Sequence, residues 1–340
     1  MTADVKRVVL MEDYLDYARH TDAVKALAQR VDLRIYTDKA RDDDELLRRL
    51  EGAQVAITIR DRVMFHSKIF ERVRGLQLLS VCGPRLAPHI DLPAATRAGV
   101  PVCCAPADPA SGDAHHATAE LTLTLILGLV KSVEHNQRVM RAGGWQTRIG
   151  TGLRGHTLGV VGSTGKVGRL VTEVAKALGM RVLAYSPRLT AERAAQQGVE
   201  AVSLEALLRQ SDVVTLHANA TPETAGMLGA AQFNLMKPGA FLVNTARAAL
   251  IDEAALREAL DSGRLAGAGL DVYWQEPLPA DHWARQHPGV LMQPHMGAFT
   301  PEGYGWIVTS GVTPVLQWLD GKPIPIANPE AQSQQKETSP

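Results

Sequence analysis

The sequence predicts an α/β fold with two doubly wound parallel sheets, and three observations lead to this prediction. Short apolar runs alternate with amphipathic helical stretches along most of the chain, which is the pattern of parallel sheets covered by helices. The chain has 340 residues, enough for about two domains of ~150 residues each. A glycine-rich turn also joins a strand to a helix in the second half of the chain.

The first hundred residues are predicted to form one small α/β unit of apolar strands and amphipathic helices. The strands are expected at Val8–Leu10, Leu33–Tyr36, Val55–Ile59, Leu76–Val81 and Val102–Cys104. The helices are expected at Thr21–Arg30, Asp43–Leu50 and His66–Arg74. The Pro-, Gly- and Ser-rich segment Ala105–Ala114 is typical of a linker.

A long helix, Thr118–Arg141, and a second alternating series follow. A helix over 166–179 ends on Gly179, and a last helix, Pro301–Leu319, is expected to be packed down by Trp306 and Trp318. The strands of this series are expected within 157–162, 181–186, 212–217, 239–245, 267–273 and 290–295.

The last helix is expected to return to the first unit, which makes that domain discontinuous. The predicted domains are residues 1–110 with 299–328, and residues 111–298. The polar residues 329–340 are expected to form a frayed tail.

Composition excludes several classes of protein. Lys and Arg number 36, as do Asp and Glu, and no long basic block is present, so nucleic acid is not expected as the main partner. The longest apolar stretch, Leu121–Val130, is far short of the ~20 residues that span a bilayer. The first ten residues lack the features of a secretory signal, and a cytoplasmic location is therefore expected.

The three cysteines fit the same compartment. Cys82, Cys103 and Cys104 form no C-x-x-C pair, and adjacent cysteines rarely meet the geometry of a disulfide. We expect buried free thiols and no metal site.

The glycine turn predicts a dinucleotide cofactor. It runs from Gly162 through Gly165, Lys166 and Val167 to Gly168 and opens a helix whose N-terminus can bind a pyrophosphate. The usual spacing is G-x-G-x-x-G, and here it is one residue longer. A tight turn without any ligand is the alternative, and the strand–turn–helix context favours the cofactor.

The end of the next strand favours NADP over NAD. An acidic residue normally binds the ribose 2′-hydroxyl there, whereas this strand ends in Tyr185 and Ser186, with Arg188 nearby. A small polar residue leaves space for a 2′-phosphate, and an arginine supplies its cation. The alternative is that Arg188 is a solvated surface residue and that either cofactor binds.

Three charged residues follow predicted strands late in the chain. Arg247 follows Asn244, Thr245 and Ala246; Glu276 follows a Leu-Asp-Val run and precedes a proline; His295 follows a proline. In this order they resemble the motifs of the D-isomer-specific 2-hydroxyacid dehydrogenase family. That family includes glyoxylate/hydroxypyruvate reductases and D-lactate, phosphoglycerate and formate dehydrogenases. The resemblance runs from about Ala53 to Asn328.

The resemblance implies a role for each of the three. Reduction of a 2-keto acid needs a hydride on carbon and a proton on oxygen, which His295 would supply as a general acid. Glu276 would favour the charged imidazolium and fix the ring. Arg247 would bind the substrate carboxylate and polarise the carbonyl.

Further residues are assigned by the same resemblance. Asp271 is implied to hold the nicotinamide carboxamide, with a turn cap as the alternative, and His217 to line the cofactor cleft through its backbone. Thr245, Ala246 and Gly297 complete the expected cofactor contacts. Asp252 is expected to be the N-cap of the helix that follows it.

The substrate loop departs from the family pattern. Cys82 and Gly83 begin the loop whose backbone N–H groups would bind the substrate carboxylate, but Pro84 removes one donor. Ala248 stands where the family commonly has glycine after the catalytic arginine.

The leading hypothesis is thus an NAD(P)-dependent dehydrogenase or reductase for a small 2-hydroxy or 2-keto acid, with a cleft between the two domains. A homodimer is expected by resemblance, through the Thr118–Trp145 region. An NAD(H)-binding corepressor-like or scaffold protein of the same fold is the rival, and a phosphite or formate dehydrogenase is a less favoured alternative.

Overall fold

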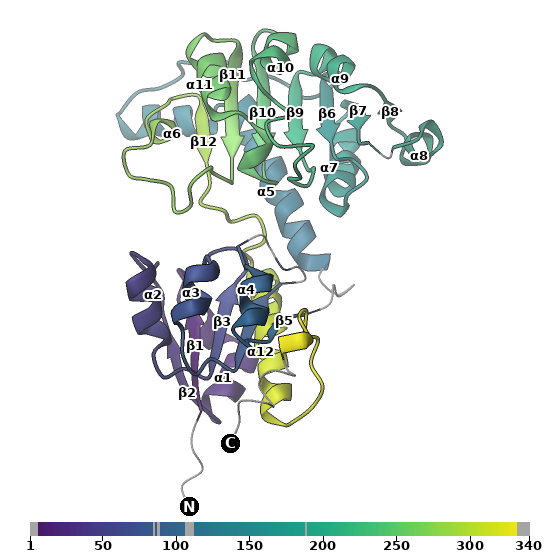
Figure 1. Cartoon of the computed structure of the whole chain (residues 1–340). Helices are drawn as coiled ribbons and strands as arrows, with labels where there is room; N and C mark the ends of the chain where they lie inside the picture. Colours follow the sequence, from purple (N-terminus) through teal and green to yellow (C-terminus); the bar gives the residue numbers. More distant parts are fainter. Residues whose placement is uncertain (1–5, 84–85, 87–88, 106–111, 188, 332–340) are drawn as a thin grey trace, which may run out of the picture. The chain divides into compact units, whose positions relative to one another are not determined.

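The computed structural model describes residues 6–83, 86, 89–105, 112–187 and 189–331. The chain forms two compact units: unit 1 comprises Met1–Gly112 and Thr300–Pro340, and unit 2 comprises Asp113–Phe299 (Figure 1). Each unit contains one sheet, and the described strands pair in parallel throughout both sheets. The predicted fold class is therefore confirmed. The tail expected over 329–340 falls outside the described residues from 332 onward.

The sheet of unit 1 has five strands in the order β2-β1-β3-β4-β5. Side chains on one face of this sheet pack with α2, α3 and α4, while α12 lies against β3, β4 and β5 on the other face, beside α1. The strands are β1 (Arg7–Met11), β2 (Asp32–Ile35), β3 (Val55–Ile59), β4 (Leu78–Cys82) and β5 (Val102–Cys104). The helices are η1 (Ala18–His20), α1 (Asp22–Ala28), α2 (Asp43–Leu50), α3 (Ser67–Arg72), α4 (Leu92–Arg97) and α12 (Pro301–Leu319).

The last helix, α12, has the bounds that the sequence predicts. Its N-cap Thr300 accepts a hydrogen bond from the backbone N–H of Gly303, and Pro301 occupies the first turn, where no N–H is needed. The two tryptophans expected to pack this helix down, Trp306 and Trp318, are half-buried, and Nζ of Lys6 lies 4.4 Å from the ring centroid of Trp318. The buried stripe repeats at helical spacing from Tyr304, and both tryptophans lie off it; its members are Tyr304, Ile307, Val308, Gly311, Val312 and Val315.

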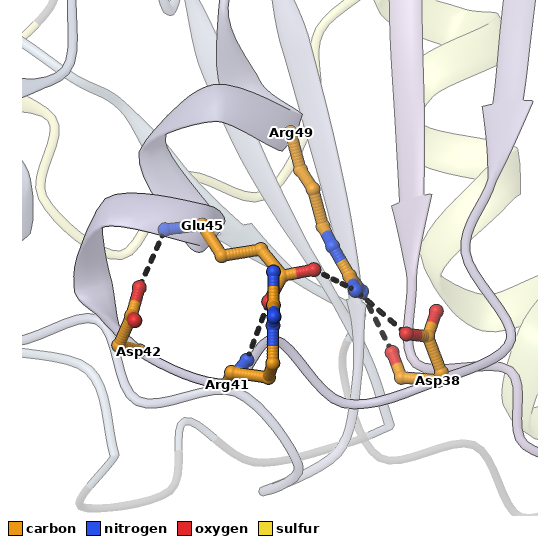
Figure 2. A network of polar contacts seen from close by, with 5 residues as sticks. All are labelled: Asp38, Arg41, Asp42, Glu45 and Arg49. Carbon is orange, nitrogen blue, oxygen red and sulfur yellow. Dashed lines mark hydrogen bonds and ion pairs between the residues drawn. The ribbon is translucent and has the colours of Figure 1, made fainter.

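A charged network holds the connection from β2 to α2. Arg49 is buried and its guanidinium contacts the carboxylates of Asp38 and Glu45 at 2.8 and 2.7 Å (Figure 2). Glu45 also accepts hydrogen bonds from Arg41, and Asp42 caps the helix by accepting from the backbone N–H of Glu45 at 2.8 Å. The buried guanidinium is thus compensated by two carboxylates, as a buried cation requires.

The sheet of unit 2 has seven strands in the order β12-β11-β10-β9-β6-β7-β8. Strands β7 and β8 lie on one side of β6, whereas β9 to β12 lie on its other side, so the strand order reverses between β6 and β9. Doubly wound sheets bind ligands at such a reversal, outside the carboxyl ends of the strands. The strands are β6 (Thr157–Val161), β7 (Arg181–Tyr185), β8 (Glu200–Ala201), β9 (Val213–Leu216), β10 (Ala240–Asn244), β11 (Leu265–Leu270) and β12 (Val290–Met292). The helices are α5 (Gly112–Val130), α6 (Val133–Arg141), α7 (Lys166–Ala177), α8 (Ala191–Gln197), α9 (Leu204–Gln210), α10 (Ala230–Leu235), η3 (Ala248–Leu250), α11 (Glu253–Asp261) and η4 (Trp283–Arg285).

The long helix expected over Thr118–Arg141 is wrong, because two helices occupy this region. They are α5 (Gly112–Val130) and α6 (Val133–Arg141), and Ser132 between them has a left-handed φ of 52° that breaks the helical hydrogen-bond ladder. The expected linker Ala105–Ala114 is also corrected, since its last residues are helical; 106–111 lie outside the described residues.

Among the described residues, no single helix is both long and apolar enough to cross a membrane. The pair Ala114–Val130 and Val133–Arg141 meets the length and composition requirement only together, with a 61° bend at the break.

Candidate active site

The glycine turn after β6 packs tightly against the end of β9. Gly162 has a φ of 89°, and a Cβ there would lie 2.6 Å from the backbone carbon of His217. Its N–H donates to the carbonyl of Tyr185 at 2.7 Å. A Cβ on Gly168 would lie 2.7 Å from the carbonyl oxygen of Gly162. Both positions therefore require glycine, which lets α7 start directly beside the reversal of strand order.

The N-terminus of α7 begins inside this turn. Gly165 is the N-cap, and Lys166 and Val167 are the first helical residues, whose N–H groups have no partner within the helix. Ser163 is fully buried, and its hydroxyl has no hydrogen-bond partner among the described residues. An N–H-rich helix end beside an unsatisfied hydroxyl fits the phosphates of a dinucleotide.

The end of β7 lies beside the same turn. The hydroxyl of Ser186 is 3.1 Å from that of Thr164. No carboxylate stands at the end of this strand, since its last residue is Tyr185. Arg188, which the sequence singles out for a 2′-phosphate, lies outside the described residues.

His217, at the end of β9, is half-buried and uncharged at neutral pH. Its ring Nε2 is 3.0 Å from the hydroxyl of Thr215, and burial lowers its pKa to about 4. Its backbone N–H donates to the carbonyl of Val161 at 2.7 Å, which ties the end of β9 to the end of β6.

The loop after β10 is held by two buried polar side chains. Asn244 accepts from the N–H of Ala246 at 3.0 Å and donates to the carbonyl of Arg247 at 2.8 Å. The hydroxyl of Thr245 is 2.7 Å from that of Thr122 on α5. The guanidinium of Arg247 donates to the carbonyl of Ala246 at 2.7 Å. Neighbouring residues of the same loop thus hold both the backbone and the side chain of Arg247.

Asp271, at the end of β11, holds the turn that carries His295. Its carboxylate oxygens accept from the N–H groups of Met296 at 2.6 Å and Gly297 at 2.9 Å, and its own N–H donates to the carbonyl of Asn244 at 3.0 Å. His295 has a left-handed φ of 57°, an unfavourable backbone for a non-glycine residue. Asp271 is 1% exposed, and burial raises its pKa to about 6, against the lowering effect of the two N–H donors.

Glu276 and His295 form a short hydrogen-bonded pair. The Nδ1 of His295 is 2.6 Å from Oε2 of Glu276, and Oε1 of Glu276 accepts from the N–H of Tyr273 at 3.0 Å. The Tyr273 hydroxyl is 3.1 and 3.0 Å from the carbonyls of Leu270 and Gln293. Because Nδ1 is taken by the carboxylate, Nε2 is the ring atom left to exchange a proton with a substrate.

The two expected substrate residues of unit 1 lie at the end of β4. The thiol of Cys82 is fully buried, contacts the carbonyl of Val308 at 3.8 Å and has its pKa raised to about 12 by burial. The N–H of Gly83 donates to the hydroxyl of Ser310 at 2.8 Å. Pro84 lies outside the described residues.

Thus Glu276 and His295 are joined directly in unit 2, and Asp271 holds the two backbone N–H groups that follow His295. Asn244 links Asp271 to the backbone of Arg247. Asp252 caps α11 by accepting from the N–H of Ala255. Sequence reasoning missed Thr122, Tyr273 and Ser310 as neighbours of the site. Thr122 and Ser310 contact residues far away in sequence, and Tyr273 contacts Glu276 through its backbone N–H.

Comparison with known proteins identifies relatives over nearly the whole chain. The model of the NAD-binding domain of D-isomer-specific 2-hydroxyacid dehydrogenases matches residues 123–297. The D-3-phosphoglycerate dehydrogenase of Archaeoglobus fulgidus is 34% identical over 91% of this chain and 56% of its own length. That of Synechocystis is 36% identical over 86% of this chain and 51% of its own length. The chain therefore spans about half the length of these curated relatives.

Solved structures share the fold. A phosphoglycerate oxidoreductase of Vibrio cholerae has a TM-score of 0.86 at 27% identity, with 93% of this chain and 100% of that one covered. The D-lactate dehydrogenase of Escherichia coli has a TM-score of 0.77 at 25% identity, with 94% and 98% covered.

Proposed function

The chain belongs to the D-isomer-specific 2-hydroxyacid dehydrogenase family, and on this premise we propose that it transfers a hydride between NAD(P) and a small 2-hydroxy or 2-keto acid. The observation that carries the proposal is the 2.6 Å contact between Nδ1 of His295 and Glu276, on a turn that Asp271 holds. A histidine held in this way has a defined ring orientation, as a general acid or base needs.

Each residue has a distinct task in this reaction. A bound nicotinamide cofactor supplies or receives the hydride. In the reducing direction, Nε2 of His295 gives its proton to the substrate oxygen; in the oxidising direction, it takes the hydroxyl proton. Glu276 stabilises the imidazolium through Nδ1 in both directions. Arg247 binds the substrate carboxylate with its planar guanidinium and draws electron density from the adjacent carbonyl.

The cofactor would lie along the carboxyl ends of β6, β7 and β9. The α7 N-terminus and the Ser163 hydroxyl would hold its phosphates, and Thr245, Ala246, His217 and Gly297 would line the rest of its site. We propose NADP as the preferred form, because Ser186 replaces the carboxylate that would repel a 2′-phosphate. Parallel titrations with NADPH and NADH, followed by nicotinamide fluorescence, test this preference.

We also propose that the protein forms a homodimer in the cytoplasm. None of the residues of α6 is buried, and apolar side chains gather on it and just after it. Trp145 and Ile149 are 70% and 98% exposed, and Val133 and Met140 are also exposed. Exposed apolar surface of this kind marks association sites. Sedimentation equilibrium of the unaltered protein and of Trp145→Ser tests whether this face joins two copies.

The proposed reaction is tested by loss of nicotinamide absorbance with a series of keto compounds. Glyoxylate, hydroxypyruvate, pyruvate and bulkier 2-keto acids are offered with NADPH and with NADH. Hydroxyacetone is the matched control for pyruvate, because it keeps the ketone but lacks the carboxylate that Arg247 would bind. We expect reduction of at least one keto acid and negligible reduction of hydroxyacetone. Tight cofactor binding without reduction of any acid would contradict the proposal and favour a nucleotide-binding protein.

A further inference from the structure

The backbone at the end of β4 is bonded to helix α12. Gly83 has a φ of 117°, and its N–H donates to the hydroxyl of Ser310, 2.8 Å away. The same hydroxyl donates to the carbonyl of Ile307 at 2.6 Å. Since its single proton is used on Ile307, a lone pair of the oxygen faces Gly83. The contact is therefore directional, with the serine as acceptor.

Two further contacts hold the same strand end against α12. The hydroxyl of Ser80 donates to the carbonyl of Gly311 at 2.6 Å, and the thiol of Cys82 lies 3.8 Å from the carbonyl of Val308. A Cβ on Gly311 would lie 2.4 Å from the sulfur of Cys82 and 3.0 Å from its Cα. The helix approaches β4 this closely only because residue 311 is glycine.

The loop that leaves β3 depends on the same backbone. The N–H of Arg60 donates to the carbonyl of Cys82 at 3.2 Å, and Arg60 has a left-handed φ of 54°. The position of a Cβ on Gly83 is 3.8 Å from Cγ of Arg60, so the arginine side chain runs alongside the glycine. The contacts of α12 with Cys82 and Gly83 therefore set where both loops begin.

A packing role alone does not account for a hydroxyl at residue 310. The neighbouring positions of α12 that face the sheet are apolar or glycine, and a half-buried serine adds little apolar contact. What the hydroxyl does supply is the acceptor for a backbone N–H at the start of the loop. An N–H left without a partner there would be costly, and the backbone of Gly83 would shift to satisfy it elsewhere.

We infer that Ser310 is a positioning residue for the substrate loop after β4. It binds the Gly83 N–H, so that this N–H is not offered to the substrate and the backbone at the end of β4, where the loop begins, is held in one position. This inference rests on the proposed function, since it assigns that loop to the substrate.

The test compares Ser310→Ala with Ser310→Thr, which keeps the hydroxyl, and with Thr309→Ala, which removes a neighbouring hydroxyl of the same helix. We expect Ser310→Ala to raise KM for the best keto acid about five- to tenfold, the effect of losing one buried hydrogen bond. Its kcat and its affinity for NADPH should stay within about twofold of the unaltered values. Ser310→Thr should restore KM, and Thr309→Ala should not change it.

Amide hydrogen exchange of Gly83 supplies a second readout. Ser310→Ala should speed this exchange at least about tenfold, whereas Ser310→Thr should not. An unchanged KM in Ser310→Ala, or a raised KM that Ser310→Thr fails to restore, overturns the inference while leaving the reaction in place. Absence of keto-acid reduction by the unaltered protein overturns the proposed function, and with it this role of Ser310.

Discussion

Replacing Asp271 by asparagine is expected to separate the activity of this protein from its stability. The carboxylate of Asp271 accepts two backbone N–H bonds, at 2.6 and 2.9 Å, that hold the turn carrying His295. An asparagine keeps one acceptor oxygen but turns its NH₂ group toward the other N–H. One charge-assisted hydrogen bond is lost and one buried donor is left unpaired, which together weaken the turn by about 2–3 kcal/mol.

That loss acts on a strained conformation. Left-handed backbone at a residue such as His295 costs about 1 kcal/mol or more, so the turn relaxes when it is no longer held. If the productive position of the ring loses about 2–3 kcal/mol relative to relaxed positions, kcat/KM falls about 30- to 150-fold. Stopped-flow measurement of keto-acid reduction gives this ratio directly.

The stability of the same variant should change less than its kcat/KM. Burial raises the pKa of Asp271 from 3.8 to about 6, so the folded state holds a proton that the unfolded state releases, and stability falls as pH rises from about 4 to about 6. At pH 7.5 the folded state therefore carries a buried charge at a net cost in stability, which the neutral asparagine removes. This gain opposes the loss of the hydrogen bonds, so Tm should fall by less than the loss of activity implies. A kcat/KM within twofold of the unaltered protein, or a fall in Tm that parallels the loss of activity, would refute this reasoning.

Four other variants test the fold and the cofactor turn. Gly162→Ala places a methyl group 2.6 Å from the backbone of His217 at a φ of 89°, and should abolish detectable NADPH fluorescence enhancement. Arg49→Met leaves two carboxylates without their cation and should lower the free energy of unfolding in urea by about 2 kcal/mol, whereas exposed Arg41→Met should lower it much less. Hydrogen bonds from Arg41, then Arg49, lower the pKa of Glu45 to about 2; their stabilisation is present above pH 4.5 and is lost as pH falls toward 2. Glu45→Gln should therefore flatten the loss of stability between pH 5 and pH 2, as followed by circular dichroism.

Much of the fold could be predicted because its signals are local. The apolar runs of parallel strands are continuous, and α12 begins at a threonine cap followed by proline, so its bounds follow from the sequence. The break between α5 and α6 could not be predicted, since nothing around Ser132 demands a left-handed residue.

The candidate site also combines residues that the sequence indicates with contacts that it does not indicate. Arg247, Glu276 and His295 follow strand ends in a recognisable order, and the 2.6 Å contact of Glu276 with His295 agrees with that order; their roles in catalysis stay predictions. The hold of Asp271 on Met296 and Gly297 joins residues about 25 positions apart through backbone atoms, which no side-chain pattern encodes. The contact of Ser310 with Gly83 spans 227 positions and has the same character.

The most direct test of the central claim is the rate of hydride transfer in a single turnover of His295→Gln, with His287→Gln as the matched control. His287 also contacts a carboxylate, that of Asp261 at 3.4 Å, but lies on another part of unit 2. We predict that His295→Gln lowers the rate at least about 100-fold while NADPH affinity is retained, and that His287→Gln has the unaltered rate. A rate for His295→Gln within threefold of the unaltered protein would contradict the assignment of His295 as the proton donor.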